Sequence, residues 1–247
     1  MKIESKRLDG LFLASSVLRV TAATPKCGIR FLNWRIRARA HVPSYELGGA
    51  GLYGICYNGA LIYVGSFLGS KKDVFGGNVI RTRWWAHFGT LTLRGHRLSV
   101  PARTIGKLLD EYASVLHPEL RDVLALAPKT LTDDSGCKAS LNRVLVANEN
   151  WERFRDAEPC DLLGSFTYFY VRFPRSRSYR ASANSSANFL RTAISHAEAE
   201  AIERLRPVAN KEIPWTGFRF PHSCQTAISV ISEILARWTC ATPDANI

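Results

Sequence analysis

The pattern of apolar and polar residues predicts strands at three places in the chain. The apolar stretch 51–65 is broken only by Asn58-Gly59, a dipeptide typical of a two-residue hairpin turn, so we expect two antiparallel strands there. Residues 34–39 alternate basic with apolar side chains, which predicts a strand with one basic face. Residues 166–173 are aromatic and β-branched, which favours a further strand there.

Elsewhere in the chain, apolar residues recur at helical spacing. They predict helices over 79–88, from Pro101 to about 116, over 118–126, from 140 to about 156, and over 223–238, with a shorter helix-like stretch at 11–18. The apolar stripe of the last helix suits either the core or a subunit contact. Together these elements predict an α/β fold in which a small central mixed or antiparallel sheet is flanked by helices.

Charge narrows the choice of partner. The 33 Lys and Arg residues exceed the 21 Asp and Glu residues and give a net charge of +12, which favours a polyanion. Three long acid-free stretches carry much of this charge, between Asp9 and Glu46, between Asp73 and Asp110, and between Asp161 and Glu198. Aromatic residues are interleaved with these basic stretches, which favours nucleic acid over a generally basic soluble surface.

Other composition features exclude some classes of protein. No apolar run approaches the ~20 residues of a membrane span, and residues 1–7 lack the apolar run of a signal peptide. The six cysteines form no pair with zinc-ligand or redox spacing. We therefore expect a reduced, cytoplasmic protein without a membrane partner.

Two tyrosine-containing tripeptides lie on the two arms of the predicted hairpin. They are Gly51-Leu52-Tyr53 and Tyr63-Val64-Gly65, followed in order by Arg83, His87, Glu198 and Asn210. This ordered set resembles the GIY-YIG nuclease superfamily, and most closely its type II restriction endonucleases. A subset of the superfamily that includes restriction endonucleases has a histidine one helical turn after the arginine, and His87 matches it. The resemblance spans residues 51 to about 210 and departs from the family at Ser66, where many members have lysine.

The resemblance also implies how the chain is divided. It predicts one elaborated domain over 1–247, with a nuclease core in 46–98 and 161–215. A basic N-terminal arm (1–45), a helical insertion (99–160) and a C-terminal helical extension (216–247) would surround that core. DNA recognition would then come from the arm, the insertion and a basic loop near 175–186.

The same resemblance implies roles for the site residues. Glu198 would hold the metal, Mg²⁺ or Mn²⁺, and the catalytic set would be Tyr53, Tyr63, Arg83, His87, Glu198 and Asn210. Tyr53 is our candidate general base, with His87 orienting it or receiving its proton, although either tyrosine could be the base. Candidate DNA contacts are Lys71, Lys72, Arg81, Arg175, Arg177 and Arg180.

Each of these residues also has a purely structural interpretation. The two tyrosines could be half-buried strand aromatics, Arg83 a surface residue and His87 a satisfied core histidine. Glu198 competes with Glu200 and Glu203 on one helix, and only its spacing from Pro207 and Asn210 selects it. Asn210 could be a helix cap instead of a site residue.

The function that we expect is magnesium-dependent cleavage of double-stranded DNA, carried out by a homodimer at least on DNA. Alternatives are a structure-specific repair or recombination nuclease, a homing-type nuclease, or a DNA-binding protein on a degenerate nuclease scaffold.

Overall fold

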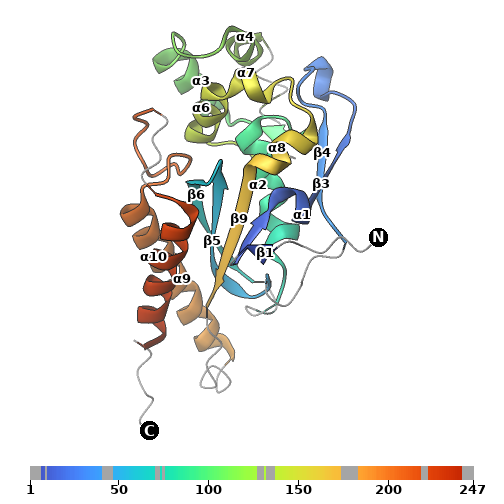
Figure 1. The fold of residues 1–247 in the computed structure, drawn as a ribbon. Helices are drawn as coiled ribbons and strands as arrows, with labels where there is room; N and C mark the ends of the chain where they lie inside the picture. The colour runs from blue at the N-terminus through green and yellow to red at the C-terminus, as the bar shows by residue number, and fades with distance from the viewer. Residues whose placement is uncertain are drawn as a thin grey trace.

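The structure is a computed structural model that describes residues 7–8, 10–40, 47–69, 73, 76–126, 131, 137–173, 183–217 and 222–240. Its centre is a five-stranded sheet with the order β1-β2-β9-β5-β6, and all its neighbouring strands are antiparallel (Figure 1). The strands are β1 (Arg7–Leu8), β2 (Leu11–Leu13), β5 (Ala50–Tyr57), β6 (Ala60–Leu68) and β9 (Phe166–Arg172). The prediction of an α/β fold with a sheet flanked by helices is confirmed, and this sheet is antiparallel.

The predicted hairpin is β5 and β6. Asn58 and Gly59 join them with φ angles of 50° and 80°, and these two positive values match the type I′ turn of two-residue hairpins. On its other edge β5 pairs with β9, so the strand predicted at 166–173 lies inside the sheet. The hairpin thus places Tyr53 on an interior strand and Tyr63 on the edge strand.

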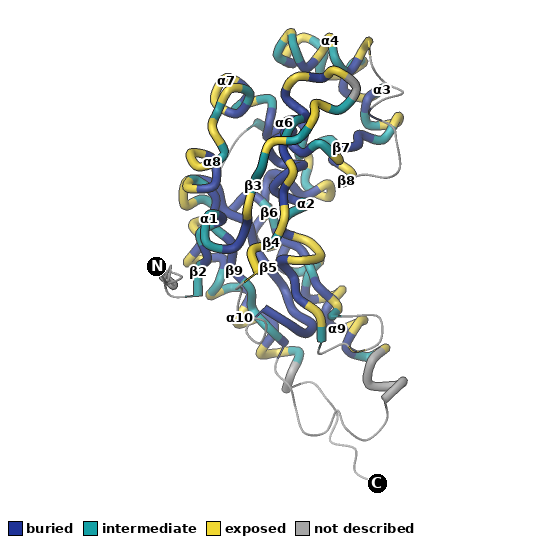
Figure 2. The backbone as a smooth tube through the Cα atoms, turned by 90° about the vertical axis from the view of Figure 1, so that its right-hand side faces the viewer, coloured by how far each residue is buried: buried dark blue, intermediate teal, exposed yellow. Residues whose placement is uncertain are grey.

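Successive residues of β5 face opposite layers, as the two-residue period of a strand requires. Tyr53, Ile55 and Tyr57 pack into one core, and Leu52 and Cys56 pack into another. Because both faces are covered, β5 is buried along its whole length (Figure 2).

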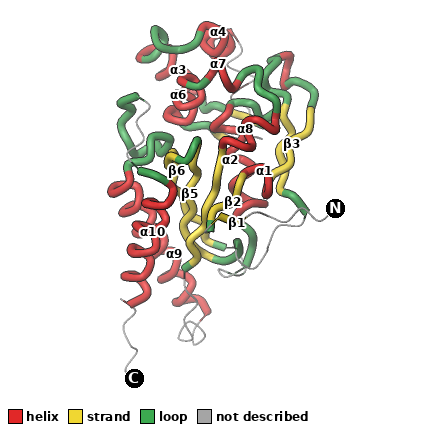
Figure 3. Tube along the Cα trace, in the orientation of Figure 1, coloured by secondary structure: helices red, strands yellow, loops and turns green. Residues whose placement is uncertain are grey.

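Helices α9 (Ala183–Leu205) and α10 (Cys224–Cys240) cover the second face side by side (Figure 3). The buried stripe of α10, which includes Ala227, Ile231 and Ile234, packs into this core. The structure therefore assigns the stripe to the core and not to a subunit contact.

The first face carries the helix predicted at 79–88, which consists of a π-helical turn (Ile80–Trp84) followed by α2 (Trp85–Thr92). The insertion lies beyond it, at the top of Figure 1. Its elements are β7 (Leu98–Ser99), α3 (Ala102–Glu111), α4 (Pro118–Leu126), β8 (Cys137–Lys138), α6 (Leu141–Glu149), α7 (Trp151–Phe154) and α8 (Pro159–Ser165). The prediction for 118–126 is confirmed, whereas the helix predicted over 140–156 is interrupted at Asn150.

The N-terminal segment, predicted as a basic arm, contributes β1 and β2 to the central sheet. The stretch 11–18 is not one helix: β2 is followed by one helical turn, α1 (Ala14–Val17), and then by β3 (Leu18–Ala22). After a 3-10 turn (Lys26–Gly28), β4 (Trp34–Ala38) pairs with β3. Trp34 and Ile36 of β4 are buried while Arg35 and Arg37 are exposed, so the predicted strand with one basic face is confirmed.

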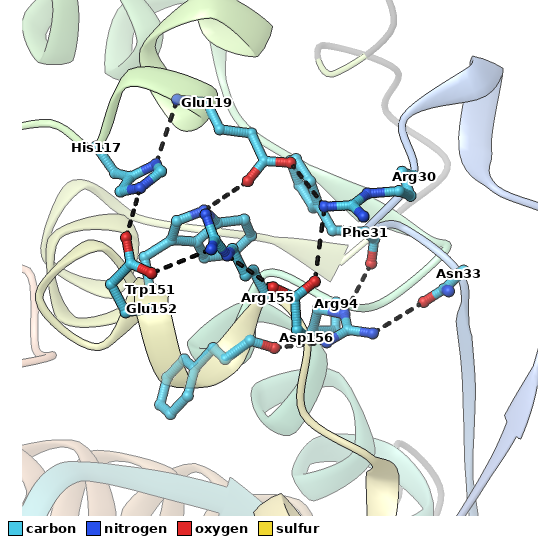
Figure 4. Close-up of polar contacts among 11 residues, drawn as sticks. Arg30, Phe31, Asn33, Arg94, His117, Glu119, Trp151, Glu152, Arg155 and Asp156 are labelled. Carbon is cyan, nitrogen blue, oxygen red and sulfur yellow. Dashed lines mark hydrogen bonds and ion pairs between the residues drawn. The ribbon is translucent and has the colours of Figure 1, made fainter.

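Arg94 fastens this segment to the insertion, as Figure 4 shows. Its guanidinium lies 4.2 Å from the centre of the Trp34 ring and donates to the carbonyls of Phe31 and Phe154. Burial lowers the pKa of Arg94 to about 10. Arg94 belongs to one of the acid-free basic stretches, but it is 5% exposed and serves the structure.

A disulfide joins Cys56 of β5 to Cys224 of α10, with Cα atoms 6.2 Å apart, so the prediction of a fully reduced protein is wrong for this pair. The cysteines are 168 residues apart, and sequence spacing gave no sign of the pair. No described helix combines the length and the apolar character needed to cross a lipid bilayer.

Candidate active site

Five of the six predicted catalytic residues line one pocket of about 550 Å³, which we call the tyrosine pocket. They are Tyr53, Tyr63, Arg83, His87 and Glu198. They come from β5, β6, the π-helical turn, α2 and α9. The pocket is also lined by Arg97, Lys138 and Arg143, so with Arg83 its wall has four Lys or Arg residues against one carboxylate.

A glycine lets the two tyrosines meet. Gly65 lies opposite Tyr53 in the β5–β6 register. A Cβ atom on Gly65 would lie 2.6 Å from Cζ and Oη of Tyr53 and 2.8 Å from Cε1 of Tyr63, closer than carbon atoms can approach. The ring of Tyr53 therefore occupies the space above Gly65. This explains on steric grounds why the last residue of Tyr63-Val64-Gly65 is glycine.

Tyr53 and His87 form a buried pair. Tyr53 Oη lies 2.6 Å from His87 Nε2, and these residues are 2% and 7% exposed. Burial, and then the charges of Arg143 and Arg83, hold the pKa of His87 well below its ordinary value, while burial raises the pKa of Tyr53 well above 10. Both groups are therefore neutral near pH 7. His87 Nδ1 is buried and has no hydrogen-bond partner among the described residues.

Arg143 of α6 is a pocket residue that the sequence reasoning missed. Its guanidinium carbon lies 4.6 Å from the centre of the Tyr63 ring, within the range of a cation–π contact. Its Nη1 atom donates to Thr90 Oγ1 at 3.3 Å, and its Nε is buried with no described partner. Because its position depends on how α6 packs against α2, no local sequence signal identifies it.

Glu198 is held by Ser66, the residue at which the chain departs from the GIY-YIG pattern. Ser66 donates its backbone N–H to Glu198 Oε1 at 3.1 Å and its hydroxyl to Oε2 at 2.6 Å. Burial raises the pKa of the Glu198 carboxyl, and the two Ser66 hydrogen bonds oppose that rise. Ser66 therefore orients the carboxylate from the edge strand of the sheet.

The competing glutamate Glu200 faces elsewhere. It accepts a hydrogen bond from Arg237 and pairs with Arg204. His196, two residues before Glu198, stacks on Trp238 and also lies away from the pocket. Glu198 lies deep within the 23-residue helix α9 and not at its start, where the family resemblance would place it.

The carboxylate of the pocket bears on whether a divalent ion could bind there. Glu198 is the only carboxylate in its wall, and the described residues contain no group of three His, Cys, Asp or Glu side chains that could hold a metal. A carboxylate has about four lone-pair sites, so two hydrogen bonds from Ser66 leave some for a cation. Mg²⁺ commonly binds through one or two carboxylates, with water and substrate phosphate as further ligands. The residues present fit that type of site.

Asn210 does not line the pocket. Its side chain bridges the backbone of Val64, accepting from the Val64 N–H at 2.9 Å and donating to the Val64 carbonyl at 2.8 Å. It is 3% exposed, and its own carbonyl accepts a hydrogen bond from Asn142. Asn210 therefore fastens the edge strand between Tyr63 and Gly65, and its predicted catalytic role stays a prediction.

Most of the candidate DNA contacts cannot be placed. Lys71, Lys72, Arg175, Arg177 and Arg180 lie outside the described residues. Arg81 is exposed and lines a second pocket beside the tyrosine pocket.

Neither protein-family models, curated proteins nor solved structures yield a match to this chain.

Proposed function

We propose that this protein is a metal-dependent DNA endonuclease with a site of the GIY-YIG type, most like a type II restriction endonuclease. One observation carries the proposal: residues 53, 63, 83, 87 and 198, selected by their order in the sequence, line a single pocket. Three further basic residues in the same wall suit an anionic phosphodiester.

The residues of the pocket can be given chemical roles. An attacking water would pass a proton to Tyr53 Oη as the tyrosine hydroxyl passes its own proton to His87 Nε2, which leaves an imidazolium. This order of proton transfers requires His87 to be neutral at the start. Its lowered pKa keeps His87 neutral near pH 7. Arg83 and Arg143 would bind the non-bridging phosphate oxygens and stabilise the charge that develops there.

Glu198 would hold the divalent ion in the orientation set by Ser66. When bound, such an ion supplies Lewis-acid stabilisation of the phosphate and of the leaving oxygen.

A DNA-binding protein on an inactive nuclease scaffold is the rival from another class. The complete set of tyrosines, arginine, histidine and glutamate in one pocket favours the enzyme. A structure-specific repair or recombination nuclease, or a homing-type nuclease, would use the same chemistry and differ only in substrate.

The test is incubation of the protein with plasmid DNA and Mg²⁺, with the ends of the products sequenced. Discrete fragments would support a restriction endonuclease, whereas a preference for branched DNA would support a repair nuclease. Glu198→Gln should bind DNA without cutting it. The matched control Glu200→Gln, from the same helix, should cut normally, and the reverse result would mean that Glu198 is not the metal ligand.

A further inference from the structure

A second pocket of about 390 Å³ lies between β4 and the helix that carries Arg83. We call it the arginine pocket, and its lining residues include Arg35, Arg37, Arg39, Arg81 and Arg97. No Asp or Glu is among its lining residues, and Trp85 and His96 are the aromatic ones. A cavity lined by five arginine residues is suited to a ligand that carries several negative charges.

Strand register concentrates charge beside this pocket. Arg37 of β4 lies directly opposite Arg19 of β3, and Arg35 lies opposite Thr21. Like charges directly across an antiparallel pair destabilise the pairing. Arg19, Arg35 and Arg37 are all exposed, and no carboxylate among the described residues pairs with any of them. Among the described residues, this surface therefore carries positive charge that no carboxylate neutralises.

Some of the other exposed arginines in the described part of the chain have acidic partners. Arg30 approaches Glu119 and Asp156, and Arg204 pairs with Glu233. Arg35 and Arg37 of β4, like Arg81 in the same pocket wall, have no such acidic partner among the described residues.

The arginine pocket and the tyrosine pocket share part of their walls. Trp85 and Arg97 line both cavities, and the guanidinium of Arg97 lies 5.9 Å from the centre of the Trp85 ring. A chain of phosphates lying along β4 would therefore pass from one pocket directly to the other.

We propose that the arginine pocket binds the phosphate backbone of duplex DNA next to the bond that is cut, with Arg35 and Arg37 of β4 contacting successive phosphates. This inference rests on the proposed function, because it takes DNA as the polyanion. It narrows the DNA recognition that the sequence predicted for residues 1–45 to the β3–β4 strand pair.

The experiment measures how DNA affinity depends on salt, using a short fluorescent duplex in EDTA so that no cleavage occurs. For duplex DNA the slope of log affinity against log salt is about 0.9 for each phosphate contact. The variant Arg35→Gln/Arg37→Gln should therefore bind with a slope smaller in magnitude by about 1.8. The control Arg204→Gln/Arg237→Gln also removes two positive charges, but from arginines that already face Glu200 and Glu233, and should keep the wild-type slope.

A slope in Arg35→Gln/Arg37→Gln equal to that of the wild type, or an equal loss in the control, would overturn the proposal. Arg37→Gln alone supplies a second readout, since it removes the repulsion with Arg19 and should raise the unfolding temperature without DNA but not with it. Cleavage of plasmid by the wild-type protein is measured separately. If the wild type cuts while the slopes are unaltered, the inference fails and the nuclease assignment stands; if it binds DNA with the expected slopes but never cuts, only the nuclease assignment fails.

Discussion

At the scale of single residues, the Tyr53–His87 pair combines two groups that burial keeps neutral. The pKa of the tyrosine is raised and that of the histidine is lowered, so Tyr53 releases its proton less readily than an exposed tyrosine would and keeps its hydroxyl proton near pH 7. A short hydrogen bond between them lets a proton arriving at the tyrosine leave at once to the imidazole. This arrangement favours His87 as the group that receives the proton and Tyr53 as the group that passes it on.

The first prediction concerns this pair. Tyr53→Phe deletes one hydroxyl and keeps the ring over Gly65, so the protein should fold and the chemical step should slow by ~10²–10⁴-fold. His87→Ala should slow the same step, and the double variant should be scarcely slower than the slower single variant, because the residues act as one unit. Single-turnover cleavage is the measurement. Near-normal cutting by Tyr53→Phe, together with an inactive Tyr63→Phe, would transfer the role of base to Tyr63.

A second prediction follows from the cation of Arg143. After burial, Arg143 is the largest cause of the lowered pKa of His87. Since only neutral His87 accepts the proton, the rate should rise with pH through that pKa. Arg143→Met removes the positive charge, so the rising limb should move to higher pH, whereas Arg143→Lys should leave it close to its wild-type position. A pH–rate profile in which Arg143→Met lowers the plateau but does not shift the limb would contradict this role.

Sequence and structure differ most for residues whose role depends on distant packing. Tyr53, Tyr63, Arg83, His87 and Glu198 could be chosen from their order along the chain. Arg143 could not, because it reaches the pocket only through the packing of an inserted helix. Ser66 was recognised as a departure from the family, but its hydrogen bonds to Glu198 depend on how α9 lies against the edge strand.

At the scale of secondary-structure elements, the features that depend on local sequence alone were predicted correctly. Asn58-Gly59 specifies its turn by backbone conformation alone, so the hairpin was predictable. The prediction of a helix over 11–18 was wrong because a short apolar run suits a strand or a helix equally well. The break at Asn150 is tertiary in origin, since Trp151 packs edge-on against Phe31 with ring centres 4.8 Å apart and donates its indole N–H to Glu119.

The third prediction tests the hairpin as the support of the site. Gly65→Ala would push a methyl group into the rings of Tyr53 and Tyr63 and should destabilise the protein by about 1–3 kcal/mol, as overpacking does, while abolishing cleavage. Gly106→Ala on α3 is the control, because a Cβ there meets nothing within 4 Å, and it should stabilise the protein by about 0.5–1 kcal/mol. Urea unfolding measures both. Equal stability of the two variants would show that the close contact at Gly65 is not limiting.

At the scale of the whole molecule, the described residues form one set of the proposed catalytic residues, and a nuclease with one such set would cut one strand at a time. Concerted cleavage of a two-fold symmetric site therefore requires two subunits on DNA. The fourth prediction is that sedimentation with such a duplex gives a complex with two protein chains, and that plasmid is converted directly to linear product. Nicked plasmid as the final product, with a single protein chain on the duplex, would refute the dimer.

Two adjacent residues of α6 give the insertion a further meaning. Asn142 donates to the carbonyls of Asn210 and Ile213, and Arg143 lies in the wall of the tyrosine pocket. One helix thus braces the loop behind the edge strand and also supplies a cation to the pocket in which we propose that the chemistry occurs. The insertion is consequently not an exchangeable cassette: a protein engineer seeking a new DNA target would have to redesign its outer surface and leave α6 intact.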